Sequence, residues 1–213
     1  MLDVGRNTFE HSTNMKLSIR ILLFTSLLFF SCVTKQKRVS GQDFDPIISP
    51  QDADTSDLYY KDIKVWKTWL NLSDTQKSNL SIEFRIWCSP ELRIKKQLIQ
   101  LRKSNGLWKA KLYSFDIRST KLENSKELTP KSNWTNIENR LIEFNIGQLP
   151  DDAKVPAELL YDDGISFIAE IFDAKSYRYT KFSNPHLIAK RNKEANYWDA
   201  LLTFIFDEFG ISY

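Results

Sequence analysis

Histidine, cysteine and glycine are scarce in this chain, and each scarcity excludes a class of chemistry. The 213 residues include two histidines, two cysteines and six glycines. A zinc site draws three or four converging ligands mostly from histidine and cysteine, and His186 has no neighbouring histidine or cysteine pair in the sequence to complete one. The glycines form no glycine-rich phosphate loop and no G-x-S-x-G nucleophile turn. We therefore expect neither a metal nor a cofactor.

A strong excess of positive charge is also missing. Thirty lysines and arginines against 27 acidic residues give a net charge of +3 and a pI of about 8.7. Nucleic-acid-binding domains usually have a pI above about 9 and gather their basic residues on one face. Nucleic acid is therefore not an expected partner. The hydrophobic share of 42% and the chain length fit one packed globular domain.

The longest uncharged apolar segment is too short to cross a membrane as a helix. Residues 21–34 carry no charge, but their length falls below the roughly 20 residues that a spanning helix needs. Lys16 and Arg20 precede this run, and the small residue Ser31 follows its most apolar part. A basic region, a short apolar region and a small residue in this order are typical of a secretory signal peptide. We expect residues 15–31 to be that signal.

The cysteine after this signal suggests a lipid anchor. The stretch Phe29-Phe30-Ser31-Cys32 resembles the lipobox of bacterial lipoproteins, although two phenylalanines stand where that family usually has leucine and a smaller residue. The relaxed pattern is similar to lipoboxes of Bacteroidota. The resemblance implies that Cys32 is diacylated and becomes the acylated first residue, held in the membrane by palmitate-like chains. The alternative is a plain secretory signal followed by an incidental thiol.

The flanks of this anchor define the remaining N-terminal regions. Residues 1–14 contain Asp3 and Glu10, which signal peptides avoid, so we expect a non-native or mis-assigned extension and a true start at Met15. Residues 32–56 are polar and aperiodic, which is typical of a flexible tether. Lys35, Lys37 and Arg38 follow shortly after Cys32, where Bacteroidota lipoproteins exported to the surface carry acidic residues. This difference favours a periplasm-facing position in the cell envelope.

Residues 57–213 show the periodicities of a single α+β domain. Apolar residues alternate through "SIEFRIWC", which predicts a half-buried strand containing Cys88 as a small core residue. Asn105-Gly106 joins two alternating runs as a type I′ hairpin turn, pairing Lys103 with Trp108 and Arg102 with Lys109. After Gly164, a three-residue loop over 173–175 would place Glu170 opposite Arg178 on the solvent side.

Three segments carry helical signals. Residues 133–146 and 193–209 have apolar residues at three-to-four spacing, with Gly210 ending the second. Residues 57–72 fit a helix better than a strand, although both patterns can be traced. Together these signals predict an antiparallel sheet of about five strands built from hairpins, with two or three helices packed on one face.

A basic hairpin is the strongest candidate for a binding surface. Residues 92–115 contain seven lysines and arginines and no acidic residue. The residues assigned to this surface are Lys96, Arg102, Lys109 and Lys111. Such a surface would attract an acidic envelope protein or a phosphate-bearing lipid or glycan. The alternative is an ordinary solvated sheet face.

Other side chains suggest weaker possibilities. Asp162, Asp163 and His186 could serve an envelope hydrolase if a pocket brought them together, and a protruding 150–163 loop could serve a periplasmic inhibitor of a hydrolase. Adjacent aspartates before glycine are more typical of turns.

An aromatic platform for sugar binding is a further possibility. It would be formed by Trp87, Tyr113, Tyr177 and Tyr179, although packing of these residues beneath helices is an equally simple explanation.

The pattern over most of residues 57–213 is similar to small Bacteroidota lipoproteins of unknown function, particularly flavobacterial ones. The likeness rests on "FRIWCSP", "LIQLRKSNGLWKAKLY", "LPDD", "YDDGISFIAEI" and "YRYTKFSNP". It implies a fold and a taxon but supplies no catalytic residues. We therefore expect a membrane-anchored envelope lipoprotein with a non-enzymatic binding or adaptor domain.

Overall fold

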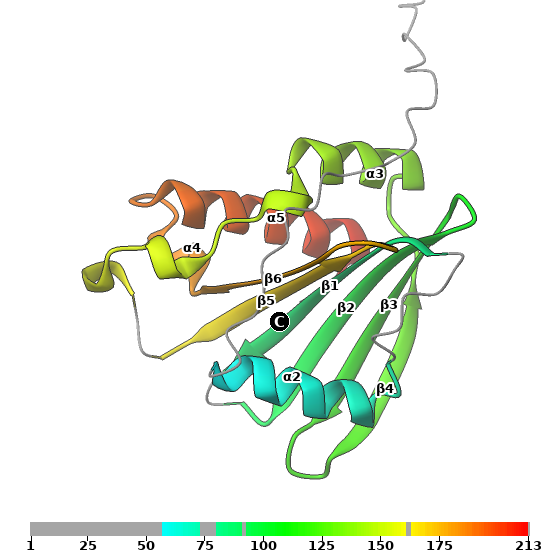
Figure 1. Cartoon of the computed structure of the whole chain (residues 1–213), viewed down its shortest axis with the longest axis horizontal. Coiled ribbons are helices and arrows are strands. Elements are labelled where there is room, and N and C mark those ends of the chain that lie inside the picture. The colour runs from blue at the N-terminus through cyan, green and yellow to red at the C-terminus, as the bar shows by residue number, and fades with distance from the viewer. Residues whose placement is uncertain (1–56, 73–79, 91–92, 161–162, 213) are drawn as a thin grey trace, which may run out of the picture. The chain divides into compact units, whose positions relative to one another are not determined.

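The computed structural model describes residues 57–72, 80–90, 93–160 and 163–212. These form a six-stranded antiparallel sheet with helices, an α+β fold, as the sequence predicts (Figure 1). The described α-helices and strands in chain order are α2 (Leu58–Trp69), β1 (Leu80–Pro90), β2 (Lys95–Ser104), β3 (Leu107–Asp116), β4 (Lys121–Leu128), α3 (Trp134–Glu143), β5 (Ile165–Phe172), β6 (Tyr177–Ser183), α4 (Pro185–Ile188) and α5 (Lys193–Phe209), and three short 3₁₀ helices lie between α3 and β5. The strands lie in the order β4-β3-β2-β1-β5-β6.

The β2–β3 hairpin has the predicted register. Lys103 pairs with Trp108 and Arg102 with Lys109 across the two strands. Asn105 and Gly106 have φ angles of 50° and 75°, as a type I′ turn requires at both central residues. The turn chemistry and the alternation of apolar residues therefore agree, and they position the basic side chains described below.

The sheet has one strand more than expected. Strand β4 pairs with β3 at the edge of the sheet, and all of its side chains except Leu128 are exposed. Its sequence, KLENSKEL, has no alternating apolar residues to indicate a half-buried strand. The backbone pairing with β3 creates this strand, and side-chain burial contributes little to it.

The predicted β5–β6 register is wrong by one residue. Glu170 pairs with Tyr179, and Arg178 pairs with Ile171. The loop therefore contains four residues, 173–176, in which Asp173 Oδ1 accepts hydrogen bonds from the backbone N–H groups of Lys175 and Ser176. Because a shift of one residue moves a side chain to the other face, Arg178 and Glu170 do not form the predicted exposed pair.

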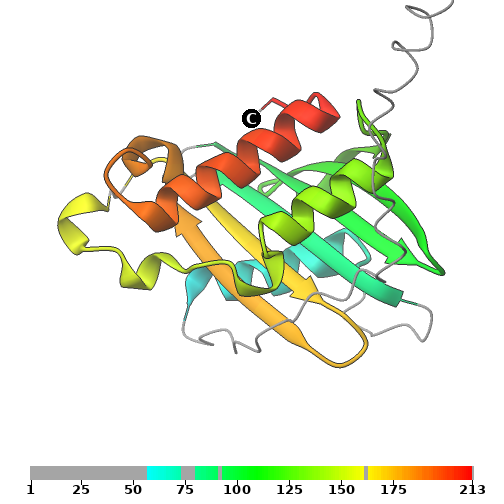
Figure 2. The ribbon, with the colours of Figure 1, turned by 90° about the horizontal axis from the view of Figure 1, so that it is seen from above.

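Helices cover both faces of the sheet, not one. Figure 2 shows α3 and α5 over one face and α2 over the other. The larger core lies under α3 and α5 and includes Phe84, Ile86 and Trp198, all fully buried. The smaller core lies under α2 and is formed mainly by Ile63, Trp66, Leu70, Trp87, Leu98, Tyr113, Phe115, Ile168 and Tyr179. The aromatic residues proposed as a sugar platform thus belong largely to this smaller core.

The three long helices begin with polar caps. The side chains of Asp57, Asn133 and Asn192 accept hydrogen bonds from backbone N–H groups in the first turns of α2, α3 and α5. Gly210 ends α5 with a left-handed φ of 61°. All three helices were predicted, and every fully buried residue that the described structure places in the two cores lies between positions 63 and 209. A chain of residues 33–213 therefore contains every described element of this fold.

The outer edge of β6 is covered by the segment that follows α3. Asp151 Oδ2 accepts a hydrogen bond from the backbone N–H of Lys181 at 3.2 Å, and Asp152 Oδ2 accepts one from Ser183 at 2.9 Å. The Pro150 carbonyl accepts hydrogen bonds from Thr180 Oγ1 and from Trp198 Nε1, at 2.9 and 2.7 Å. These contacts satisfy groups that an edge strand would otherwise leave open to pairing.

Candidate functional site

The predicted site residues do not all lie on one accessible surface. Cys32 falls outside the described residues. Lys96 is wrong as a surface residue, because it is 4% exposed and its Nζ donates a hydrogen bond to the Pro90 carbonyl. The sequence did not indicate that Lys96 is buried, because lysine side chains are normally solvated. Its burial results from the packing of its aliphatic chain beside α2.

Arg102, Lys109 and Lys111 do lie together, and we name these three residues the basic strip. Arg102 is paired with Lys109 across β2 and β3, and alternate residues of β3 point to the same face. Lys109 is exposed, whereas Arg102 and Lys111 are half-buried. The strip occupies the face of the sheet that also carries α2, at the end near the β2–β3 turn.

The surroundings of the basic strip neutralise only part of its charge. Arg102 Nε lies 4.0 Å from Glu83 Oε2, and Lys111 is paired across the strands with the exposed residue Glu127. Lys111 Nζ also lies 4.9 Å from the centre of the Tyr113 ring. Lys109 forms no ion pair with another described residue, so the end of the strip nearest the turn stays positive.

An exposed leucine extends the strip toward the turn. Leu107 is 69% exposed and lies two residues before Lys109 on β3, so it shares the face of the strip. It is next to Gly106 at the tip of the hairpin. The tip therefore combines a large apolar side chain with adjacent cations.

Next to the strip, a charged network is buried between α2 and the sheet. Glu170 is fully buried and accepts hydrogen bonds from Lys67 Nζ at 2.9 Å, Trp87 Nε1 at 2.9 Å and the Tyr177 hydroxyl at 3.0 Å. Arg85 lies 3.7 Å from Glu170 and donates to Glu83 at 2.6 Å. Two cations and two carboxylates balance one another, which is how buried charges are tolerated. This network holds α2 on the sheet.

The candidate hydrolase residues do not form a catalytic arrangement in the described structure. His186 is an exposed residue of α4, and Asp163 is exposed beside Gly164; Asp162 lies outside the described residues. The 150–163 loop proposed for an inhibitor is held against β6 at its start by the contacts of Pro150, Asp151 and Asp152. Burial raises the pKa of the Asp152 carboxyl, and this carboxyl accepts a hydrogen bond from the backbone of the edge strand β6.

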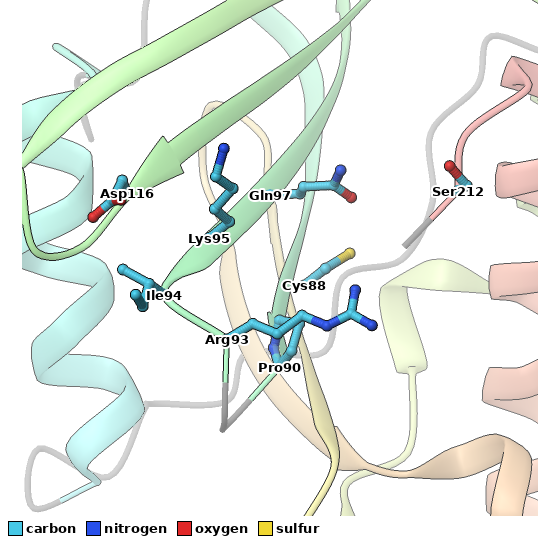
Figure 3. Close-up of a pocket in the computed structure, with 8 residues that line it drawn as sticks. All are labelled: Cys88, Pro90, Arg93, Ile94, Lys95, Gln97, Asp116 and Ser212. Carbon is cyan, nitrogen blue, oxygen red and sulfur yellow. The ribbon is translucent and has the colours of Figure 1, made fainter.

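A pocket of about 590 Å³ lies at the other end of the sheet from the hairpin tip. Its lining residues are Cys88, Pro90, Arg93, Ile94, Lys95, Gln97, Asp116 and Ser212 (Figure 3). Cys88 and Gln97 are paired neighbours on β1 and β2, so their side chains project to the same side of the sheet, and Arg93 lines the same pocket (Figure 3). Ser212 approaches from the segment after α5.

The residues that line the pocket differ in polarity and in whether they already have partners. Cys88 is 1% exposed, and burial raises the pKa of its thiol to about 12, so it contributes a neutral, weakly polar surface. Asp116 Oδ1 already accepts hydrogen bonds from the backbone N–H groups of Arg118 and Ser119. Lys95 Nζ lies 3.1 Å from Glu123.

Sequence reasoning missed both the pocket and the buried network. Cys88 was predicted as a core residue and is one, but nothing in the sequence shows that Arg93, Gln97 and Ser212 meet beside it. One feature of the sequence does indicate the network. In "EFRIW", Glu83, Arg85 and Trp87 stand at alternate positions and therefore share one face of the strand. That face was assigned to solvent because charged residues are seldom fully buried.

No family model, curated protein or solved structure matches this chain. Within the described residues, no group of three or more His, Cys, Asp or Glu side chains is arranged to hold a metal ion. The described helices include none that is long and apolar enough to cross a membrane.

Proposed function

We propose that this protein is a lipoprotein of the bacterial cell envelope, anchored through Cys32 and facing the periplasm, with a non-enzymatic binding domain. Its basic strip contacts phosphate-bearing lipid headgroups. The signal-like residues 15–31 and the lipobox-like sequence ending at Cys32 support the anchor. The strip supports the binding role, and the two parts of the proposal are tested separately.

The observation that carries the binding role is the combination of cations and an exposed leucine at the hairpin tip. Like charges directly opposite one another destabilise a sheet, so the Arg102–Lys109 pair brings a cost that anionic headgroups would remove. Each cation near an anionic membrane surface contributes about 1 kcal/mol of binding. Leu107, exposed between these cations and the turn, can enter the apolar boundary below the headgroups. Leu107 beside the cations favours a surface that has an apolar layer directly below its anions, as a bilayer has.

Metabolic labelling tests the anchor. In cells given radiolabelled palmitate, the wild-type chain and a Cys88→Ala control should incorporate label, while Cys32→Ala should not, because only Cys32 follows the signal. Cys32→Ala should also be lost from the membrane fraction of the cells, because it has no acyl chains to hold it there. Equal labelling of Cys32→Ala and wild type would refute the anchor without bearing on the strip.

Vesicle binding tests the strip without the anchor. A chain of residues 33–213 should sediment with phosphatidylglycerol vesicles and not with phosphatidylcholine vesicles, and more weakly as salt rises. Reversing two cations in Lys109→Glu/Lys111→Glu should weaken binding roughly 30-fold or more, given about 1 kcal/mol for each lost cation. The matched control is Lys154→Glu/Lys190→Glu, which changes two exposed lysines outside the strip by the same total charge.

Leu107→Ser separates lipid contact from simple charge attraction. It should weaken vesicle binding while leaving the salt dependence unchanged, because it removes apolar burial and no charge. Equal binding by the double charge variant and its control would contradict lipid contact by the strip. Crosslinking in cells to an acidic protein, lost in the double charge variant, would assign the strip to that partner instead.

A further inference from the structure

The pocket at the end of the sheet contains a polar atom that needs a partner. Gln97 Oε1 is buried and accepts no hydrogen bond from the described residues. A buried acceptor without a donor costs about 1–3 kcal/mol, and native structures contain few of them. Gln97 lines the pocket, and Figure 3 shows its side chain extending beside Cys88 on the side of the sheet from which Ser212 approaches. A ligand that donates a hydrogen bond would satisfy this atom.

The same pocket presents a cation that the described structure does not neutralise. Arg93 is exposed, and no ion pair links it to another described residue. The other lining charges are engaged, since Lys95 is paired with Glu123 and Asp116 caps the turn after β3. Arg93 is therefore the residue suited to an anionic group, and a guanidinium binds a carboxylate through two parallel hydrogen bonds.

The rest of the lining is suited to an apolar group. Pro90 and Ile94 are apolar, and Cys88 behaves as a small hydrophobic residue because its thiol stays protonated. The volume of about 590 Å³ lies within the range of about 300–1,000 Å³ that is usual for small-molecule sites. An apolar wall with a few converging polar groups is the general form of such a site.

We propose that this pocket binds a small amphipathic carboxylate with an adjacent N–H, such as an N-acylated amino acid or the C-terminal end of a short peptide. Arg93 binds the carboxylate, Gln97 Oε1 accepts the hydrogen bond from the N–H, and the apolar body lies against Pro90 and Ile94. The pocket is separate from the basic strip and from Cys32, so this inference does not depend on the proposed lipid contact or anchor.

N-acetyl-L-leucine is a suitable probe because it has the carboxylate, one amide N–H and a branched apolar side chain. Titrated into ¹⁵N-labelled residues 33–213 without membranes, it should shift the resonances of Arg93, Gln97 and Cys88, with a Kd on the order of 1 mM expected for a ligand of this size. Arg93→Gln should weaken binding at least about 10-fold through loss of a charge-assisted pair. Gln97→Leu should weaken it about 5-fold through loss of one neutral hydrogen bond.

Two altered probes assign the roles of the two residues. 4-Methylpentanoate keeps the carboxylate but lacks the amide N–H, so Gln97→Leu should no longer weaken binding while Arg93→Gln still does. N-acetyl-L-leucinamide lacks the carboxylate, so its binding should not respond to Arg93→Gln. Lys190→Gln, an exposed charge loss outside the pocket, serves as the control for each titration.

The outcomes that overturn the inference are definite. No shift of the pocket resonances at tenfold the expected Kd would refute it, as would binding that neither variant weakens. Weakening by Arg93→Gln alone would refute the assignment of Gln97. Gln97→Leu can be used only if its NMR spectrum shows that it folds. If it does not fold, the affinities of the wild-type protein for N-acetyl-L-leucine and 4-methylpentanoate are compared instead. Equal affinities would refute the acceptor role of Gln97.

Discussion

Glu170 illustrates how a single carboxylate can organise one face of this sheet. It is fully buried and collects hydrogen bonds from α2, β1 and β6 through Lys67, Trp87 and Tyr177. A buried charge is tolerated only when its partners remain in place. The position of α2 therefore depends on the charge of this side chain as well as on the apolar contacts of Trp66.

Removing that charge should be costly. Glu170→Gln keeps the shape of the side chain but leaves Lys67 and Arg85 with one carboxylate between them, so the free energy of unfolding should fall by about 3–5 kcal/mol. The control is Glu143→Gln, which breaks an exposed pair with Arg140 and should cost less than about 1 kcal/mol. Urea unfolding followed by circular dichroism gives both values, and similar values for the two variants would contradict the structural role of the network.

Cys88 should be an unreactive thiol despite its place beside the pocket. Burial raises its pKa to about 12, so at pH 8 the reactive thiolate should be roughly 2,000-fold rarer than in the unfolded chain, where the pKa is about 8.5. Reaction of residues 33–213 with Ellman's reagent should accordingly be slow, and should rise about tenfold per pH unit between pH 8 and 10. Fast labelling of the folded protein at pH 8 would show that the thiol ionises far more readily than its burial implies.

At the scale of elements, the connection into β5 depends on one glycine. Gly164 has a φ of +140°, and a Cβ added there would lie 1.8 Å from Asn184 Oδ1. That oxygen accepts a hydrogen bond from the Ile165 backbone N–H at 2.8 Å, while Asn184 Nδ2 donates to the Asp163 carbonyl at 2.9 Å. The glycine thus makes room for the side chain that links the start of β5 to the end of β6.

Two glycine substitutions separate local backbone strain from the loss of this contact. Gly106 has a φ of +75°, and a Cβ added there would meet no atom within 4 Å. Gly106→Ala should therefore lower the free energy of unfolding only by the strain of a left-handed alanine, about 1–2 kcal/mol. Gly164→Ala must also displace the buried Asn184 and should cost roughly 3 kcal/mol or more. Thermal and urea unfolding of both variants measure the difference, and an equal or smaller cost at Gly164 would contradict this role for Asn184.

At the scale of the whole molecule, the two cores share the same strands. On β1, Phe84 and Ile86 face α3 and α5, while Trp87 between Ile86 and Cys88 faces α2. One core cannot lose its strands while the other keeps them. Unfolding should therefore be a single cooperative transition.

Fluorine NMR of 5-fluorotryptophan-labelled protein can test this cooperativity. Trp66 and Trp87 report on the smaller core, and Trp198 reports on the larger one. Their folded signals should disappear at the same urea concentration. Earlier loss of Trp66 and Trp87 would show that α2 and its face unfold as a separate unit.

The sequence predicted those parts of the fold in which local signals and burial agree. The Asn105-Gly106 turn and its flanking strands are correct because turn geometry and apolar alternation specify the same register. Strand β4 was missed because an exposed edge strand has no apolar pattern. The register of β5 and β6 depends on one residue of loop length, which Asp173 decides through its hydrogen bonds.

The sites were less predictable than the fold. The sequence identified the positive hairpin because its charges are close in the chain, but it did not show that Lys96 turns inward. The pocket joins the end of β1, the start of β2, the end of β3 and the segment after α5, so its residues become neighbours only after folding. Gln97 and Ser212 have no sequence signal that separates them from ordinary polar residues.

Both borders of the open sheet carry features that oppose pairing with a second copy of the chain. On β6, Asp151 and Asp152 occupy the backbone N–H groups of Lys181 and Ser183, and on β4 exposed charged side chains disfavour the addition of another strand. A protein tethered to a bilayer by the proposed acyl chains diffuses in two dimensions, where encounters between neighbours are frequent. Edges that disfavour strand addition would help many copies crowd on one membrane without growing into a continuous intermolecular sheet.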